Sequence, residues 1–262
     1  MSTRWPFLPP RPDSIRHRLI FALDVETLGE AERLVALLVR EVGVFKVGKQ
    51  LFLATGPEVV RMIQRYGAEV FLDLKFHDIP HTVARAGVEA ARLGVRFFDL
   101  HASGSSEMME RTRAEVTRVC RREGIRRPKI LAVTVLTSLR KLDLRRVGVP
   151  DPVEDQVVRL ARLARRAGMD GVVASPLEIA RIRRECGRGF LIVTPGVRPA
   201  SAGQDDQKRI MTPEEAMRSG ADYLVLGRPI RDARDPLAAA REVVAEMARG
   251  FLTARTRPGL QA

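Results

Sequence analysis

Short runs of apolar residues recur along the chain and alternate with longer stretches in which apolar and polar positions follow a helical period. Each run is almost continuously hydrophobic, which is typical of parallel strands that are covered on both faces. We therefore predict strands at residues 19–23, 44–47, 70–74, 97–100, 130–136, 171–174, 190–193 and 223–226.

The stretches between these runs carry the start and stop signals of helices. Several have a proline at or near the first helical position, and several end just before a glycine. The predicted helices cover residues 28–40, 57–66, 82–93, 106–123, 153–167, 176–186, 213–219 and 236–248.

Eight predicted strands alternating with eight predicted helices indicate an α/β protein with a single (β/α)8 TIM barrel. We assign residues 19–250 to the barrel, 1–18 to a short irregular lead-in and 251–262 to a C-terminal tail. The alternative is a doubly wound open sheet. The even spacing of the elements and the lack of a GxGxxG loop after the first strand favour the barrel.

Composition narrows the class of protein. The 262 residues, 45% of them hydrophobic, suffice for one large core. No stretch approaches the ~20 apolar residues of a membrane span, and the first residues do not resemble a signal peptide, so we expect a cytoplasmic protein without a membrane partner. Cys120 and Cys186 lie far apart, which favours buried thiols over a disulfide or a metal site.

A formal net charge of +13 makes nucleic-acid binding a hypothesis to weigh. The basic residues are almost all arginines, spread over helix positions and not interleaved with aromatic residues. We therefore predict no nucleic-acid partner, and we expect the positive field to attract an anionic substrate.

Polar residues or glycines follow the predicted strands at their carboxyl ends, where barrel active sites form. These residues should converge on one mouth of the barrel. They are Asp24, Lys46, Lys49, Asp73, Lys75, His77, Asp78, His101, Ser103, Thr134, Thr137, Ser138, Ser175, Thr194, Arg198, Gly227 and Arg228.

The sharpest local motif is DLKFHD at residues 73–78. Alternate residues of a strand point the same way, so Asp73 and Lys75 share the barrel-facing side, and Lys46 of the neighbouring strand can reach the same site. We predict an alternating array of Lys46, Asp73, Lys75 and Asp78 in which each charge supports the ionised form of its neighbours. The alternative is a solvated ion-pair network at the rim.

A protonated lysine among carboxylates suits the replacement of carbon dioxide by a proton. It stabilises the carbanion that develops and then protonates it. The pairing argues against a Schiff-base nucleophile.

The last two strands carry a second motif. Gly227 and Arg228 follow the final strand, and Gly196 and Arg198 follow the strand before it. Glycines let backbone N–H groups approach phosphate oxygens, and arginine adds a bidentate clamp, so we predict a phosphate site here.

Metal binding is not expected from the histidines. His77, His81 and His101 lack the helical i, i+4 spacing with a third carboxylate ligand, and the nearby aspartates are matched by lysines. We predict no metal ligand and no cofactor.

Together these motifs closely resemble the bacterial orotidine 5′-monophosphate decarboxylases. The DxKxxD element alone is shared by a superfamily, whereas its combination with the later blocks is specific. The matching blocks run in order from about residue 19 to 231: FALD at 21–24, KVG at 46–48, DLKFHDIP at 73–80 followed by TV, VTVLTS at 133–138, TPGVRP at 194–199, DQKRI at 206–210 and LGRPI at 226–230.

The resemblance implies conversion of orotidine 5′-monophosphate to UMP and carbon dioxide, the last step of pyrimidine (UMP) biosynthesis, without metal or cofactor. Lys75 would face the C6 vinyl carbanion and protonate it, with Asp73 near the substrate carboxylate. The enzyme would be a homodimer in which Asp78 and Thr82 are contributed across the interface.

The same resemblance implies how the substrate is held. Asp24 and Lys46 would bind the ribose hydroxyls, and Thr137, with Ser138 as a neighbouring candidate, would lie by the pyrimidine. The remaining contacts would come from Gln207, bridging base and phosphate from a lid over residues 198–209, and from the phosphate-binding residues Gly227, Arg228 and Arg198.

Two positions depart from the family pattern: His81 stands where asparagine is expected, and Ser105 where glycine is usual. Two other functions stay open. One is a phosphosugar enzyme of the same superfamily, such as 3-keto-L-gulonate 6-phosphate decarboxylase or hexulose 6-phosphate synthase, which share the DxKxxD array but use a divalent metal. The other is a barrel that binds nucleotides or RNA without turnover.

Overall fold

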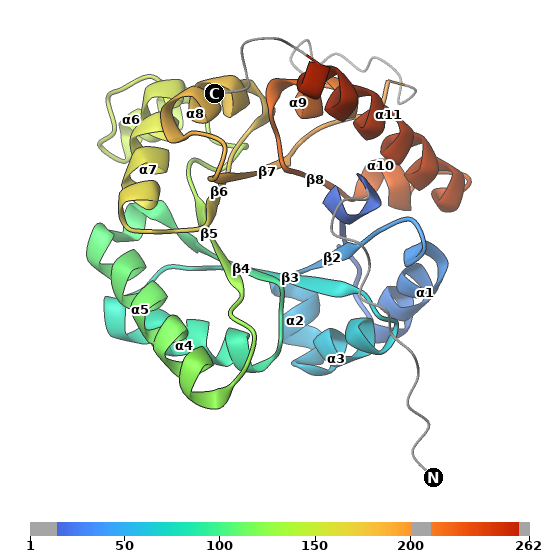
Figure 1. Cartoon of the computed structure of the whole chain (residues 1–262), viewed down its shortest axis with the longest axis horizontal. Coiled ribbons are helices and arrows are strands. Elements are labelled where there is room, and N and C mark those ends of the chain that lie inside the picture. Colours follow the sequence, from blue (N-terminus) through green and yellow to red (C-terminus); the bar gives the residue numbers. More distant parts are fainter. Residues whose placement is uncertain (1–14, 201–210, 257–262) are drawn as a thin grey trace.

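The computed structural model describes residues 15–200 and 211–256, and within them parallel strands close into a barrel (Figure 1). Strands adjacent in sequence are neighbours in space, and β1 pairs with β8 to complete the ring. This confirms the predicted fold class. The strands are β1 Leu19–Ala22, β2 Val44–Gly48, β3 Glu69–Phe76, β4 Phe97–His101, β5 Lys129–Val133, β6 Gly171–Val173, β7 Leu191–Pro195 and β8 Tyr223–Leu226.

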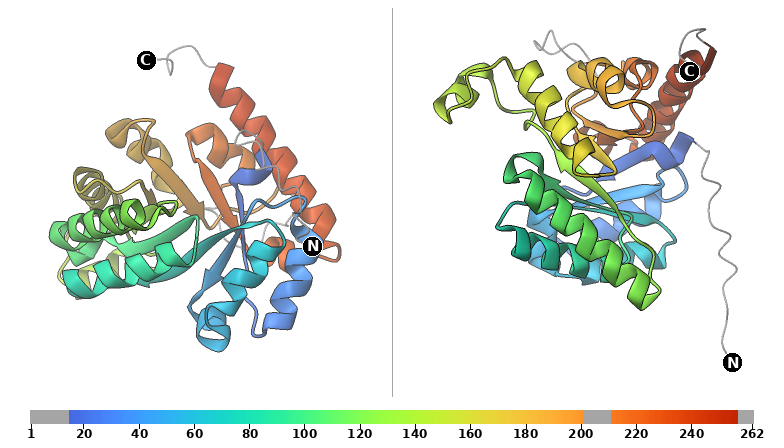
Figure 2. Two further views of the ribbon diagram at one scale, coloured as in Figure 1. Left: turned by 60° about the horizontal axis from the view of Figure 1, so that its bottom comes forward. Right: turned by 60° about the vertical axis from the view of Figure 1, so that its left-hand side comes forward.

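Helices surround this ring (Figures 1 and 2). The α-helices are α1 Leu28–Leu38, α2 Lys49–Thr55, α3 Glu58–Arg65, α4 Pro80–Arg92, α5 Ser106–Glu123, α6 Lys141–Arg146, α7 Val153–Arg166, α8 Ile179–Cys186, α9 Pro213–Ser219, α10 Arg228–Arg231 and α11 Pro236–Thr256. Short 3-10 helices are η1 Ile15–Arg18, η2 Ala102–Gly104 and η3 Pro176–Glu178. Among the described residues, none of the helices has the length and hydropathy of a membrane span.

Several elements differ from the sequence prediction. Helices α2, α6 and α10 were not predicted, and α11 continues to Thr256 instead of ending at residue 248. Strand β5 ends at Val133 and not at residue 136, because its partner β6 ends at Val173. Beyond that point Thr134 donates both its backbone N–H and its hydroxyl to the Val173 carbonyl. The chain then leaves the sheet toward α6, which stands away from the barrel (Figure 2).

The apolar interior is divided into two clusters by the alternation of the strands. The larger cluster lies between the strands and the helices, and it includes Cys120 and Cys186, which are buried free thiols as predicted. The smaller one fills the barrel with inward-facing side chains, among them Phe71 and Phe97, whose rings meet edge to face with centroids 6.0 Å apart. This apolar layer forms the floor of the barrel beneath the strands' carboxyl ends.

Aspartates brace the opposite, amino-terminal end of the barrel. Asp170, just before β6, accepts the Ile130 N–H of β5 at 2.9 Å, and Asp222, just before β8, accepts the Ile192 N–H of β7 at 2.8 Å. Each carboxylate also pairs with an arginine: Arg127 and Arg183, respectively. The two carboxylates therefore join neighbouring strands where regular pairing begins.

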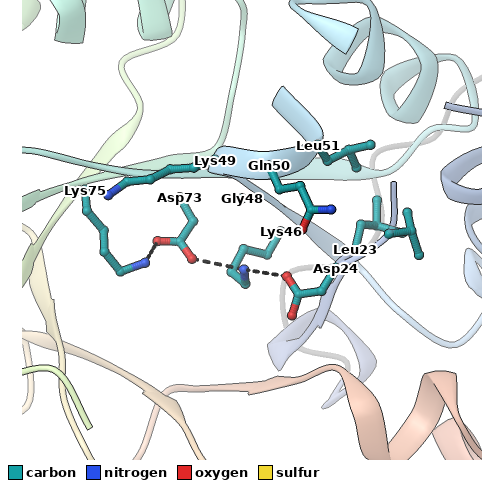
Figure 3. Close-up of a pocket in the computed structure, with 10 residues that line it drawn as sticks. Leu23, Asp24, Lys46, Gly48, Lys49, Gln50, Leu51, Asp73 and Lys75 are labelled. Atoms are coloured by element: carbon teal, nitrogen blue, oxygen red, sulfur yellow. Dashed lines mark hydrogen bonds and ion pairs between the residues drawn. The ribbon is translucent and has the colours of Figure 1, made fainter. Parts of the chain in front are cut away.

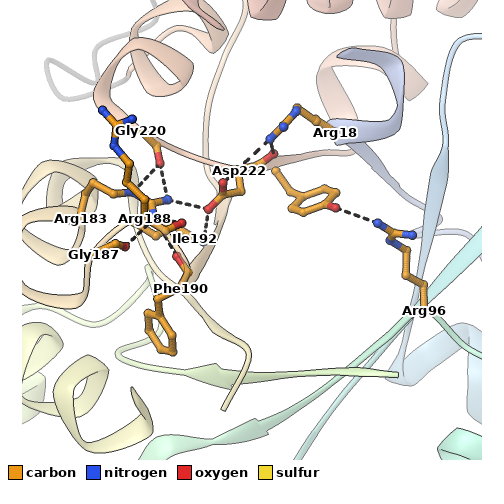
Figure 4. Close-up of polar contacts among 10 residues, drawn as sticks. Arg18, Arg96, Arg183, Gly187, Arg188, Phe190, Ile192, Gly220 and Asp222 are labelled. Carbon is orange, nitrogen blue, oxygen red and sulfur yellow. Dashed lines mark hydrogen bonds and ion pairs between the residues drawn. The ribbon is translucent and has the colours of Figure 1, made fainter. Parts of the chain in front are cut away.

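Arg183 of α8 links several loops at the amino-terminal end of the barrel through one guanidinium group (Figure 4). Its guanidinium is largely buried and donates to the Asp222 carboxylate at 2.6 Å. It also donates to backbone carbonyls of the loop between α8 and β7 and of the turn before β8, namely those of Gly187, Arg188, Phe190 and Gly220.

We predict that Arg183→Leu lowers the free energy of unfolding by about 3 kcal/mol, because the half-buried Asp222 carboxylate loses its nearest cation and several backbone carbonyls lose their donor. The urea midpoint measures this loss. Arg184→Leu is the matched control: that side chain is exposed on the same helix, and we expect a change within about 0.5 kcal/mol. Equal effects of the two variants would contradict the assignment.

Candidate active site

Four charged side chains form a continuous chain of ion pairs at the carboxyl-terminal mouth of the barrel (Figure 3). Lys46 Nζ of β2 lies 3.4 Å from Asp24 Oδ1 and 3.0 Å from Asp73 Oδ2. The second oxygen of Asp73 pairs with Lys75 Nζ. Three of the four predicted members, Lys46, Asp73 and Lys75, form this array, whereas its fourth member is Asp24 and not the predicted Asp78.

The position of these residues follows from the strand period. Phe71 lies on the barrel floor, and Asp73 is two residues further along β3, so it points inward one layer higher. Lys46 stands in the same relation to Val44 of the floor. The four residues of the ion-pair chain line a cavity of about 210 Å³, together with Gly48, Lys49 and Gln50.

Burial and pairing act in opposite directions on these groups. Burial of Asp73 works to raise its pKa, but the charge of Lys46, a hydrogen bond with Asp99 and the charge of Lys75 hold that pKa well below its usual value. Burial of Lys46 works to lower its pKa, yet Asp73 and Asp24 raise the pKa above its ordinary value. The pair is therefore ionised at neutral pH.

Asp99 of β4 belongs to this site, although it was not singled out from the sequence. It is fully buried and accepts a hydrogen bond from the Lys75 backbone N–H at 2.8 Å. The only sequence signal was a carboxylate inside an apolar run, FFDL, two residues after Phe97 and so on the inward face.

Three other predicted residues are exposed near the mouth and outside the ion-pair chain. Asp78 lies in the turn after β3, where its carboxylate accepts the Ile79 N–H at 2.6 Å, and no ion pair to Asp78 is formed within the described chain. Thr82 is exposed on α4, and Thr137 is exposed on the loop after β5.

The predicted phosphate residues are divided between the described and undescribed parts of the chain. Gly227 borders the ion-pair chain: a Cβ there would come within 3.2 Å of the Ala22 Cβ and 3.4 Å of Asp24 Oδ2. Arg228, next in the chain, is exposed. Arg198 lies in the loop after β7 and donates its backbone N–H to the Met211 carbonyl at 3.2 Å. Gln207 and most of the predicted lid lie outside the described residues.

His77 and His101 stack at the edge of the site, with ring centroids 5.3 Å apart. Burial, followed by the charges of His77, Lys75 and Lys49, lowers the pKa of His101 to about 4, so this ring is neutral at neutral pH. Within residues 15–200 and 211–256 there is no group of three or more His, Cys, Asp or Glu side chains placed to hold a metal ion.

The structure shows the surroundings of the two residues that depart from the family pattern, Ser105 and His81. Ser105 adopts a φ of 107° and caps α5, where its hydroxyl accepts the Met108 N–H at 3.2 Å. The cap offsets part of the strain of a conformation that favours glycine. His81 is exposed near the start of α4.

Comparison with known proteins places these features in a family. The profile of the orotidine 5′-phosphate decarboxylase / HUMPS family matches residues 17–243. The orotidine 5′-phosphate decarboxylase of Pelobacter propionicus is 59% identical over 239 residues, which cover 91% of this chain and 98% of that protein. The corresponding protein of Geobacter sulfurreducens is 58% identical over 238 residues, covering 91% and 99%.

A solved structure gives the same result. The crystal structure of orotidine 5′-phosphate decarboxylase from Lactobacillus acidophilus superposes with a TM-score of 0.78 at 36% identity, over 88% of this chain and 99% of that one. The resemblance found in the sequence motifs is confirmed, and the chain belongs to the orotidine 5′-phosphate decarboxylase / HUMPS family.

Proposed function

We propose that this protein decarboxylates orotidine 5′-phosphate to UMP and carbon dioxide, with no metal or cofactor, in the cytoplasm as part of pyrimidine biosynthesis. The observation that carries the proposal is the chain of ion pairs through Asp24, Lys46, Asp73 and Lys75 at the barrel mouth, in which Asp73 is buried. It occurs in a chain that is 59% identical to a protein named for this activity.

Lys75 is the proposed acid. When the bond between C6 and the carboxylate breaks, its electron pair stays on C6 of the pyrimidine. A fixed ammonium group beside that carbon stabilises the developing charge and then transfers a proton to C6, which leaves a neutral amine to be reprotonated from water. Asp73 holds the Lys75 amino group in place through their ion pair.

The remaining groups bind the substrate. We assign the ribose hydroxyls to Asp24 and Lys46, which lie on the outer side of the chain of charges. Thr137 is assigned to the pyrimidine. The phosphate is assigned to Gly227, Arg228 and Arg198, with Gln207 reaching both base and phosphate. Binding energy from the phosphate would then serve to position C6 against Lys75.

The enzyme is further proposed to act as a homodimer. Asp78, His81 and Thr82 are exposed at the turn into α4, and the neighbouring Ile79 is an apolar side chain that is 65% exposed. A second copy of the chain packed on this turn would cover Ile79 and carry Asp78 and Thr82 into the partner's site.

Lys75→Ala tests the proposed acid. We expect the turnover number for orotidine 5′-phosphate to fall by more than about a thousandfold, because both the fixed charge and the proton are lost. The loss of ultraviolet absorbance of the substrate measures the rate. Lys141→Ala, in an exposed lysine on α6, is the control and should match the unaltered protein. Substantial turnover by Lys75→Ala would exclude the proposed role.

Chelation tests the independence from metal. We expect the same rate with and without excess chelator, because the positive charge at the reacting carbon comes from lysine. No turnover of orotidine 5′-phosphate in chelator, together with magnesium-dependent activity on a sugar phosphate, would instead indicate a phosphosugar enzyme.

Mixing inactive variants tests the shared site. Lys75→Ala and Asp78→Asn should each be inactive alone. After the subunits exchange, about a quarter of the activity should return, since half of the dimers are mixed and one of their two sites has both residues intact. Mixing Lys75→Ala with Asp73→Asn is the control and should restore nothing, because these two residues belong to one chain. No recovery with Asp78→Asn would place Asp78 in the same chain's site or outside any site.

A further inference from the structure

Strand β3 is bulged where it passes Asp99 of β4. The register pairs Leu72 with Phe98 and then Phe76 with Leu100, so four steps along β3 face two steps along β4. A bulge leaves backbone groups without their ladder partners. Within the bulge Lys75 takes a φ of 52°, a left-handed conformation that residues with a Cβ adopt only when their surroundings hold them there.

The Asp99 side chain supplies the missing partner. Its Oδ1 accepts the Lys75 N–H at 2.8 Å, in place of a ladder carbonyl. Because Asp99 lies in the apolar interior and is fully buried, this acceptor is well shielded from competing water. The carboxyl group therefore holds the backbone of the proposed acid in its left-handed conformation.

The surroundings of the other Asp99 oxygen indicate whether the Asp99 side chain carries a proton. Oδ2 is buried, and no donor among the described residues reaches it. The carboxyl group of Asp99 is in hydrogen-bonding contact with that of Asp73, and we assign this contact to Oδ2 because Oδ1 already accepts from the Lys75 N–H. Two carboxylates are both acceptors, so this contact is a hydrogen bond only if one of them carries a proton. Asp73 is paired with Lys46 and Lys75, which leaves the proton on Asp99.

We propose that Asp99 is a positioning residue that works as a neutral acid: it accepts from the Lys75 backbone through Oδ1 and donates its proton to Asp73 through Oδ2. One buried group thus fixes both ends of the ion pair at the reacting centre. The kinetic part of this proposal rests on the decarboxylase function proposed above.

The surroundings favour the neutral form. Burial, then the charge of Asp73, raise the pKa of Asp99 well above its usual value, against a smaller opposing effect of Lys75. Across from Asp99 on β5 stands Leu131, which is apolar, and His101, two residues along β4, is neutral at neutral pH. The charged groups that act on Asp99 from the flanking strands are Asp73 and Lys75, both on β3.

Asp99→Asn and Asp99→Leu form the matched pair of variants. Asparagine keeps one acceptor and one donor in the same shape, so kcat should stay within about threefold of the unaltered protein. Leucine keeps neither, and we expect kcat to fall at least about a hundredfold with a smaller change in KM, because the acid is misplaced while the phosphate and ribose contacts stay. A large loss of kcat with asparagine would overturn the proposal.

The pH dependence of stability tests the proton directly, without substrate. Between the unfolded-state pKa of aspartate, about 3.9, and the raised folded-state pKa, the folded protein holds one more proton, so its stability falls as the pH rises. Asparagine does not titrate. We expect the urea midpoint of Asp99→Asn, minus that of the unaltered protein, to increase as the pH rises through this window. Above the window the difference should stay constant. A constant or reversed difference would show an ionised Asp99.

Infrared spectroscopy offers a second readout at neutral pH. Replacing Asp99 by asparagine should remove one carbonyl band of a buried protonated carboxyl group, which the difference spectrum between the two proteins isolates, and a difference spectrum without this loss would contradict the assignment. The stability and infrared results do not depend on the reaction. If the unaltered protein failed to turn over orotidine 5′-phosphate, the proposed function would fall and the Asp99 proton would still be tested.

Discussion

Asp73 accepts ion pairs from two lysines at once, Lys46 on one carboxylate oxygen and Lys75 on the other. This double pairing is the interaction on which the site depends. An unpaired charge buried at this depth would cost several kcal/mol, and in practice it would lose or gain a proton instead. Lys46 and Asp73 keep each other ionised, so the centre of the site is a single electrostatic unit.

The rest of the barrel makes this unit possible. The inward-facing floor that contains Phe71 and Phe97 keeps water from reaching the charges from below, which strengthens their attraction. The braces at Asp170 and Asp222 secure the amino-terminal ends of the strands, far from the site. Stability and chemistry are therefore placed at opposite ends of the same strands, as is general in this fold.

The bulge in β3 brings the acid into position at a local cost. Lys75 would be more relaxed in a regular strand, and its left-handed backbone is held by the Asp99 carboxyl group. A strained residue that is held by a buried partner is typical of functional sites, because the strain is tolerated only where the surroundings dictate the geometry. This links the shape of the backbone to the direction of the Lys75 amino group.

Much of this could be read from the sequence alone. Continuous apolar runs and helical periods are local signals, so they predicted the barrel, and the two-residue strand period predicted that Asp73 and Lys75 would meet Lys46. The early end of β5 was missed because it depends on where the neighbouring β6 ends. Asp24 became the outer member of the chain of charges, and the placement of Asp78 in a partner's site stays a prediction.

The sequence by itself determined the order of strands and helices and the set of residues at the barrel mouth. It could do so because the hydrophobic period and the end of a strand depend on residues that are close together in the sequence. Only the tertiary structure decided that β3 bulges opposite β4 and that Asp99 meets both Asp73 and the Lys75 backbone. The register between two strands depends on the closure of the whole ring. A single aspartate in an apolar run carries no local sign of the partner it will find.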